Sequence, residues 1–241
     1  MIAVDAVDIW KRFGGRYVLR ELSFKVGEGE VYGIVGPNGA GKTTTLRILA
    51  TILKPDKGDV YLLGKSVIKD TSDVRRIVSY LPEDVGVYKH LTGREFLKIN
   101  GSIQGLRNRD LEEAVEYAVR ISGLGELVDA PMGSYSKGMR RRVMLARTLM
   151  GKSKVLILDE PTSGLDVEHA VYVRKLIKEY VKQMNASCIV SSHNMLEVEY
   201  LCDRIALMKN GSIIVEGEPE QIKKEYEAEN LEEVFIKAVR R

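Results

Sequence analysis

The sequence has little of what marks secreted, membrane-spanning or metal-clustered proteins. Its 241 residues include only two cysteines, Cys188 and Cys202, with no metal-ligand spacing and too few for a disulfide framework. Both are expected to be small core residues in a reducing compartment. No apolar run approaches the length of a membrane span, and residues 1–5 lack the basic and apolar regions of a secretory leader. A role at a membrane would therefore need a partner that spans it.

An excess of charge of one sign is also missing. Lys and Arg number 37 against 34 Asp and Glu, and the net charge of +3 is too small to indicate a nucleic-acid-binding protein. Neither an internal repeat nor a low-complexity linker is visible. The hydrophobic fraction of 44% and the charged fraction of 29% are ordinary for a soluble globular protein. The length suits one large domain or two small ones.

The most informative stretch runs from residue 36 to residue 43 and reads Gly-Pro-Asn-Gly-Ala-Gly-Lys-Thr. It matches the motif G-x-x-x-x-G-K-[ST], in which backbone N–H groups wrap a phosphate and glycines allow close approach. A strand-like run, 31–35, precedes it. A helical pattern, 43–50, follows, so that a helix N-terminus is expected to point at the same phosphates. Two other Gly-Lys-Ser triplets, at 64–66 and 151–153, lack the first glycine of the motif. Only the stretch 36–43 therefore matches it in full.

Each part of this loop has an expected role. Lys42 is expected to reach the β- and γ-phosphates of a nucleotide, and the Thr43 hydroxyl is expected to ligate Mg²⁺. The residues predicted to contact the nucleotide here are Gly36, Pro37, Asn38, Gly39, Ala40, Gly41, Lys42, Thr43 and Thr44.

A second chemical feature is the acidic pair Asp159-Glu160, which follows four apolar residues, 155–158. A buried strand would deliver Asp159 to its carboxyl end, where α/β sheets bind their ligands. Asp159 is predicted to hold magnesium through water, and Glu160 to polarise the attacking water. The alternative, two solvated acids in a loop, is disfavoured because the apolar run leads straight into Asp-Glu-Pro.

The remaining pattern predicts an α/β core with a helical insert. Residues 1–30 predict short strands with turns, and Asn210-Gly211 predicts a hairpin. Apolar residues at helical spacing over 92–103 and 110–122 predict a helical subdomain at 85–151. The core is predicted to comprise 1–84 and 152–220, with a helical tail at 221–241. Other expected strands cover 3–10, 18–26, 59–63, 77–81, 186–191, 205–209 and 212–215. Other expected helices cover 72–76, 167–184 and 195–201.

Three further motifs complete a set. Ser136-Lys137-Gly138-Met139 opens a predicted helix that runs through Arg147, Ser163-Gly164-Leu165-Asp166 follows the acidic pair, and His193 follows a predicted strand. In this order and spacing, the chain resembles the ATP-binding-cassette (ABC) ATPases, the motor subunits of membrane transporters, over essentially its whole length. The resemblance implies an α/β fold: a P-loop NTPase (RecA-like) core with an N-terminal antiparallel β subdomain and an inserted α-helical subdomain.

The resemblance also implies residue roles. The glycine-rich loop is Walker A and the acidic strand end is Walker B, with Glu160 as general base and His193 in contact with the γ-phosphate. Ser136 and Gly138 belong to the signature motif, which caps the ATP bound to the other protomer. Asp166 lies in the loop that crosses the dimer interface. Ser136 is also a good N-cap, and its helix offers a second phosphate site, with a merely capped helix as the alternative.

The chain departs from the family pattern in two motifs. The signature, usually Leu-Ser-Gly-Gly-Gln, reads Tyr-Ser-Lys-Gly-Met, which keeps the serine and one glycine. Glu83 replaces the usual glutamine; a carboxylate only accepts hydrogen bonds, which suits a magnesium ligand but makes the sensing role less secure. Lys137 and the arginines at 140–142 could favour ATP, contact the other protomer or form a solvated face, and the solvated face is favoured for at least two of the arginines.

Two aromatic positions are implied by the family. Phe13 falls where the family stacks an aromatic ring on adenine, with Tyr17 as the alternative and a partly buried structural phenylalanine as the bland interpretation. In the family, the groove beside residues 85–105 receives a helix of the membrane subunit. Tyr88 is the docking candidate in that segment, whereas Leu91 and Phe96 are expected in the subdomain core.

The sequence therefore predicts an ATP-hydrolysing subunit that dimerises with a second copy around two Mg-ATP and drives transport through a separate transmembrane permease subunit. Export is favoured because residues 230–235, the signature variant and Glu83 resemble those of ATPases that serve drug, lipid or polysaccharide exporters. The expected cofactor is Mg²⁺, with ATP as substrate. No nucleic-acid partner is expected, and the location would be cytoplasmic, on the inner face of the cell membrane through the membrane subunit.

Three other functions fit the sequence less well. A soluble ABC ATPase that acts on DNA or the ribosome usually carries a long coiled-coil insertion or two cassettes, and this chain has neither. A module that senses ATP without turnover would not need Glu160 and His193. A GTPase would need an Asn-Lys-x-Asp guanine reader, which is missing.

Overall fold

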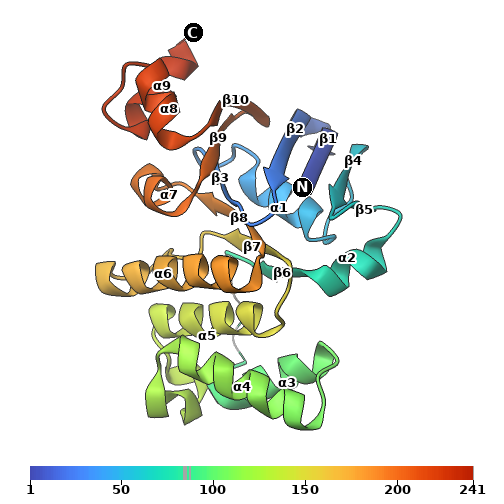
Figure 1. Cartoon of the computed structure of the whole chain (residues 1–241), viewed down its shortest axis with the longest axis vertical. Coiled ribbons are helices and arrows are strands. Elements are labelled where there is room, and N and C mark those ends of the chain that lie inside the picture. Colours follow the sequence, from blue (N-terminus) through green and yellow to red (C-terminus); the bar gives the residue numbers. More distant parts are fainter. Residues whose placement is uncertain (84–85, 87, 241) are drawn as a thin grey trace.

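Two sheets and a layer of helices lie one after another along the long axis of the molecule (Figure 1). The structure, a computed structural model, describes residues 1–83, 86 and 88–240. The predicted boundary between core and insert, at residues 84 and 85, and Val87 of the expected docking segment lie outside the described residues. Among the residues that are described, no helix is both long enough and apolar enough to cross a membrane.

The N-terminal sheet is antiparallel, with the strand order β2-β1-β4-β5. Its first two strands have 12 residues each, so the prediction of short strands over residues 1–30 is wrong. Register shifts between Ala6 and Ile9 and between Ile9 and Lys11 interrupt the pairing of β1 with β2, which breaks the alternation that a long strand would show. The strands are β1 (Ile2–Phe13), β2 (Arg16–Gly27), β4 (Lys57–Leu62) and β5 (Lys65–Ser66).

The central sheet has the order β10-β9-β3-β8-β7-β6 and is parallel except for β10, which forms the predicted hairpin with β9. Its parallel strands end at one edge, where the phosphate loop and the acidic pair meet. These strands are β3 (Val31–Val35), β6 (Val78–Leu81), β7 (Val155–Asp159), β8 (Ser187–Ser192), β9 (Arg204–Lys209) and β10 (Ser212–Gly217).

Alternate residues of the central strands divide between two hydrophobic cores. In β7, Leu156 and Leu158 belong to the core shared with the helices, whereas Val155 and Ile157 belong to the core shared with the antiparallel sheet. This follows from the period of two in a strand. Because both faces of the sheet are covered, the strand reads as an uninterrupted apolar run in the sequence.

Helices cover both faces of the central sheet. Helix α1 packs between the two sheets, and α6 and α7 cover the opposite face, against which the helical layer of α3, α4 and α5 also packs (Figure 1). The helices are α1 (Lys42–Leu49), α2 (Thr71–Ile77), α3 (Gly93–Ile103), α4 (Asn108–Ser122), α5 (Lys137–Met150), α6 (Val167–Met184), α7 (Met195–Leu201), α8 (Pro219–Glu225) and α9 (Leu231–Arg240), with 3₁₀ turns η1 (Gly125–Asp129) and η2 (Met132–Ser134).

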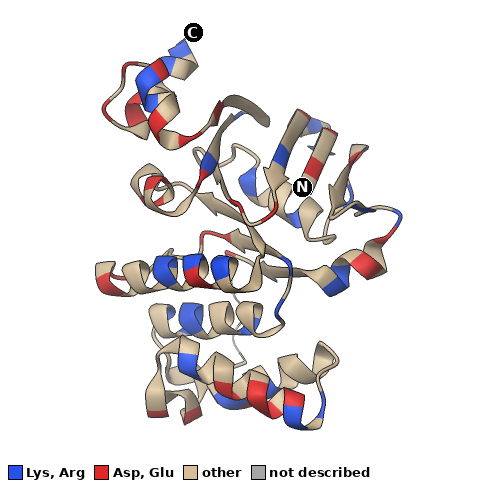
Figure 2. Ribbon diagram, in the orientation of Figure 1, with Lys and Arg blue, Asp and Glu red and all other residues tan. Residues whose placement is uncertain are grey.

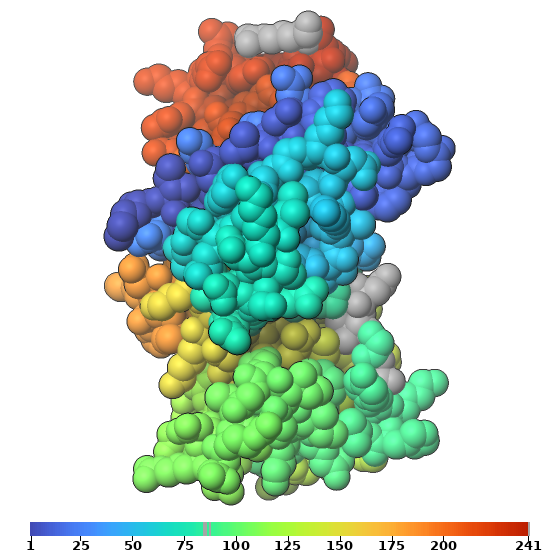
Figure 3. All heavy atoms as spheres, turned by 90° about the vertical axis from the view of Figure 1, so that its right-hand side faces the viewer, coloured from blue at the N-terminus to red at the C-terminus, as the bar shows by residue number. Residues whose placement is uncertain are grey.

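The outer shape and the charges agree with the sequence. A side view places the C-terminal helices at one end and the helical layer at the other, with the antiparallel sheet and residues 50–80 between them (Figure 3). Lysine, arginine, aspartate and glutamate alternate along the elements instead of collecting on one of them (Figure 2). The division into subdomains remains a prediction.

Candidate active site

The loop between β3 and α1 turns tightly around a cavity of about 310 Å³, which its residues 38–44 line together with Val18, Glu83 and Glu160. Gly41 has a φ of +109° at the N-cap of α1, a conformation that favours glycine. A Cβ atom on Gly41 would lie 2.7 Å from Cδ2 of Leu19 and 3.0 Å from the carbonyl oxygen of Val18. The loop therefore requires glycine there, and its backbone N–H groups line a concave surface suited to phosphate.

Two polar side chains of α1 follow this loop. The buried Lys42 ammonium donates hydrogen bonds to the carbonyl oxygens of Gly36 at 2.7 Å and Pro37 at 3.3 Å. Burial lowers the pKa of Lys42, while the nearby carboxylates of Glu160, Asp159 and Glu83 oppose that shift. The Thr43 hydroxyl donates to Oδ1 of Asp159 over 3.3 Å. The Lys42 ammonium thus lies near the acidic strand end, and the Thr43 hydroxyl bonds to it.

Asp159 lies where the parallel pairing of β7 and β8 places it. It is fully buried, and its Oδ1 accepts a hydrogen bond of 2.5 Å from the hydroxyl of Ser191 on β8. Within the described part of the chain, no group of three or more His, Cys, Asp or Glu side chains is arranged to hold a metal ion. One carboxylate and one hydroxyl fit Mg²⁺, which usually keeps several waters and takes further ligands from substrate phosphates. Glu83, the third predicted metal residue, lines the same cavity.

Glu160 is buried and pairs with His193. Its Oε1 lies 2.9 Å from Nδ1 of the more exposed His193 ring. Burial raises the pKa of Glu160, and the hydrogen bond and charge of His193 partly offset that rise. The backbone of Glu160 has a φ of +52°, and its N–H donates to the backbone oxygen and to the hydroxyl of Ser191, both at 3.1 Å. A buried carboxylate of raised pKa beside an imidazole suits a general base.

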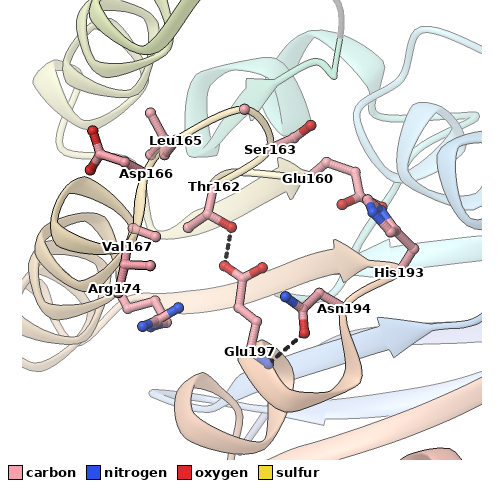
Figure 4. Close-up of a pocket in the computed structure, with 12 residues that line it drawn as sticks. Glu160, Thr162, Ser163, Leu165, Asp166, Val167, Arg174, His193, Asn194 and Glu197 are labelled. Atoms are coloured by element: carbon pink, nitrogen blue, oxygen red, sulfur yellow. Dashed lines mark hydrogen bonds and ion pairs between the residues drawn. The ribbon is translucent and has the colours of Figure 1, made fainter.

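Glu160 and His193 also border a second cavity, of about 320 Å³ (Figure 4). In Figure 4, Thr162 points at Glu197 and its hydroxyl donates to Oε1 of that carboxylate. The Glu197 N–H donates a hydrogen bond to Oδ1 of Asn194, which caps α7. The buried Glu197 therefore ties the segment after β7 to the segment after β8.

Ser136, Gly138 and Asp166 lie outside the cavity around the phosphate loop, although Asp166 also lines the second cavity with Glu160 and His193. Ser136 and Gly138 border a third cavity, of about 310 Å³, together with Asp166. Ser136 caps α5 by accepting from the Met139 N–H at 3.1 Å, as predicted. Asp166 caps α6 by accepting from the His169 N–H at 2.9 Å.

The two aromatic candidates lie at the tip of the antiparallel sheet. The Phe13 ring is exposed, with the Lys11 ammonium 5.6 Å from its centroid. Tyr17 packs edge-on against Trp10, with ring centroids 5.3 Å apart. Neither ring lines the cavity around the phosphate loop, so the choice between them as the adenine platform remains a prediction.

The prediction that at least two of the arginines at 140–142 form a solvated face is wrong. Arg141 is buried, and burial lowers its pKa to about 10. Arg140 and Arg142 are half-buried, and each donates to a backbone carbonyl, that of Tyr135 at 3.0 Å and that of Gly123 at 3.1 Å. The sequence reasoning also missed Ser191 and Glu197. The polar end of the β8 run was the available signal for Ser191.

Comparisons with known proteins agree with this geometry. Residues 19–163 match the family model described as ABC transporter. The chain is 37% identical over 212 residues to the uncharacterized ABC transporter ATP-binding protein YhcH of Bacillus subtilis (strain 168), which covers 88% of this chain and 68% of that protein. It is 35% identical over 237 residues to the Nod factor export ATP-binding protein I of Rhizobium sp. (strain N33), covering 97% and 77% of the two chains.

A solved structure has the same fold. The ATP binding subunit of an ABC transporter superimposes with a TM-score of 0.89 at 25% identity, over 98% of this chain and 99% of that one. The similarity therefore includes both sheets and the helical layer.

Proposed function

Because the chain belongs to the ABC transporter family and is an ATPase of that family, we propose that it hydrolyses ATP to drive export through a separate transmembrane permease subunit. One observation carries the proposal. A single edge of the central sheet brings the phosphate loop and Glu160 to one cavity, with Asp159 bonded to Thr43 and His193 paired with Glu160, although these segments are far apart in the sequence. Phosphate contacts, a magnesium site and a base are what ATP hydrolysis requires.

In this proposal, the loop N–H groups and Lys42 hold the β- and γ-phosphates of ATP. Thr43 and Asp159 would hold Mg²⁺, which when bound would supply positive charge beside the phosphate oxygens. Glu160 takes a proton from the water that attacks the γ-phosphate, and its raised pKa suits that exchange near neutral pH. His193 orients the Glu160 carboxylate and would contact the γ-phosphate.

Each active site would be shared by two copies of the chain. The cavity bordered by Ser136, Gly138 and Asp166 is separate from the phosphate-loop cavity of the same chain. The Ser136 helix N-terminus can therefore serve an ATP that another protomer holds. This supports a dimer in which two ATP molecules lie between the protomers.

The permease would dock between the core and the helical layer. A cavity of about 720 Å³ lies there, and Ile52, Arg75, Ile103 and Arg147 are among its lining residues. Ile52 and Ile103 are 60% and 78% exposed, so this cavity offers apolar surface that a partner could cover. Tyr88, the docking candidate, is 63% exposed. Docking there would hold the protein at the inner face of the membrane. Export is supported by the relative named for Nod factor export.

Mixed dimers test the proposal. Lys42→Ala removes the phosphate cation from one chain. Ser136→Asp keeps a good N-cap but places a negative charge where the partner's γ-phosphate would lie. Each variant alone should lack ATPase activity. A mixture should recover part of the wild-type activity, because each mixed dimer contains one site with both parts intact. Ser134→Asp, two residues earlier, is the matched control and should keep wild-type activity. A mixture as inactive as its parents, with mixed dimers demonstrably formed, would contradict the shared site.

A further inference from the structure

The Arg141 side chain is the most extensively bonded group near the active site that no motif accounts for. Arg141 is only 4% exposed, although it lies on α5 between two half-buried arginines. Its hydrogen bonds to described residues all go to backbone carbonyls. The acceptors are Pro161 at 3.2 Å from Nε, Pro82 at 2.5 Å and Glu83 at 3.1 Å from Nη1, and Glu160 at 2.6 Å together with Asp159 from Nη2.

These acceptors belong to two separate segments. Residues 82–83 directly follow β6, and residues 159–161 include the end of β7 and the turn after it. Both segments carry predicted magnesium and catalytic groups, namely the carboxylates of Glu83, Asp159 and Glu160. Arg141 binds none of these carboxylates. Arg141 instead binds the backbone from which these carboxylates project, so the carboxylates remain available for the active site.

The shape of the guanidinium group explains the choice of residue. Its N–H donors form a planar fork that reaches several acceptors at once, whereas a lysine ammonium is a compact point charge. Glu160 needs such support, because its φ of +52° is uncommon for a residue with a side chain and persists only where surrounding contacts enforce it. Arg141 donates to the Glu160 carbonyl and Ser191 accepts from the Glu160 N–H, so the peptide groups on both sides of this residue are held.

We propose that Arg141 is a positioning residue for hydrolysis, which fixes the backbone on both sides of the catalytic cavity and links it to the helix that begins at Ser136. The inference rests on the proposed ATPase mechanism. Arg141 lies less than two turns after the Ser136 cap on one rigid helix. A displacement of that helix, such as contact with a partner's ATP, would therefore move the carbonyls of residues 82–83 and 159–161 together. The base would reach its working position only when the signature end is correctly docked.

The test separates binding from chemistry. Arg141→Lys keeps the charge and the long stem but cannot reach all of the carbonyls. Arg140→Lys is the matched control on the same helix, because Arg140 donates to Tyr135 and touches neither segment. We expect Arg141→Lys to bind Mg-ATP within about threefold of the wild-type Kd, since the phosphate loop is untouched. Its kcat should fall by about 10²-fold, the cost of a small misplacement of reacting groups. Arg140→Lys should retain wild-type Kd and kcat.

Three outcomes would overturn the inference. Wild-type kcat in Arg141→Lys would show that the contacts are dispensable. Parallel losses of ATP binding and kcat would indicate a general structural role instead of positioning, and so would a variant that does not fold, as judged by its thermal unfolding. Failure of the proposed function itself would look different, because the wild type and Arg140→Lys would then also show no ATP hydrolysis.

Discussion

At the residue scale, Glu160 combines burial, an uncommon backbone conformation and an ion-pair partner. A residue held at such a φ costs on the order of 1–3 kcal/mol, which the rest of the fold must offset. The bonds from Ser191 and Arg141 to its peptide provide that restraint. The conformation aims the carboxylate at His193 and at the phosphate-loop cavity.

Glu160→Gln should leave ATP binding nearly intact and stop turnover. The amide has nearly the same size and can still accept a hydrogen bond, but it cannot take a proton from water. Loss of general-base assistance is typically worth about 10²–10⁴ in rate. Steady-state phosphate release, alongside an equilibrium Kd for Mg-ATP, checks the prediction. Release by the variant at the wild-type rate would remove Glu160 from its role.

The pH dependence follows from the same burial. Because the pKa of Glu160 is raised, the acid limb of kcat should lie at higher pH than for an ordinary glutamate. His193 partly offsets the rise, so His193→Ala should move this limb to still higher pH, besides lowering kcat itself. Measured kcat between about pH 5 and 9 locates both limbs. If the acid limbs of the wild type and His193→Ala lie at the same pH, His193 does not influence the titration of Glu160.

The raised pKa of Glu160 also determines how its ionisation changes the stability of the fold with pH. A carboxyl whose pKa is raised by folding binds its proton more tightly in the folded state. Its favourable contribution is present below the unfolded pKa and is lost as the pH rises through the folded pKa. At a pH above its folded pKa, the ionised Glu160 therefore opposes folding. This agrees with a residue kept for chemistry and not for stability.

Sequence reasoning found the residues that belong to compact linear motifs. Each of these motifs is recognisable from a few neighbouring residues: the loop 36–43, the acidic pair and Ser136. The structure brings the loop and the acidic pair together at one cavity. Sequence reasoning could not find Arg141, because its partners are backbone carbonyls 18 to 59 residues away. Every residue type has a backbone carbonyl, so such contacts leave no pattern in the sequence. Glu197 was also missed, since its partner Thr162 lies 35 residues earlier.

At the scale of elements, the predicted helices and the predicted strands of the central sheet match the structure, whereas β1 and β2 are longer than predicted. The helix 92–103 begins with a complete capping box formed by Thr92 and Glu95, a local signal that fixes its start. The strands β1 and β2 lack such a signal. Bulges shift their pairing, so the alternation fades while backbone pairing with β4 continues.

Helix α5 allows its cap and its proposed phosphate contact to be separated. Ser136→Ala should lower the free energy of unfolding by about 1 kcal/mol, the usual cost of losing an N-cap. Ser136→Asp should leave that free energy nearly unchanged, because aspartate caps as well as serine. Chemical denaturation of both variants measures the difference. Equal losses would mean that the observed hydrogen bond to Met139 contributes nothing specific.

At the scale of the whole molecule, the position of the two half-sites implies association that depends on nucleotide. If the γ-phosphate and magnesium join the two protomers, ligand binding stabilises the dimer by mass action and ADP lacks the joining group. Glu160→Gln with Mg-ATP should therefore run as a dimer in analytical ultracentrifugation, and the same protein with Mg-ADP as a monomer. A dimer of equal strength in both nucleotides would contradict that arrangement.

The central sheet described above also determines how the protein should melt. Along β3, β7, β8 and β9, neighbouring residues alternate between the two cores, so that one core cannot lose its packing while the strands that wall the other stay in place. The cassette should therefore unfold in a single calorimetric transition despite its layers. Its van't Hoff and calorimetric enthalpies should coincide, as they do for small cooperative domains. Such cooperativity would allow force applied at the helical layer to reach the phosphate loop without loss to local melting.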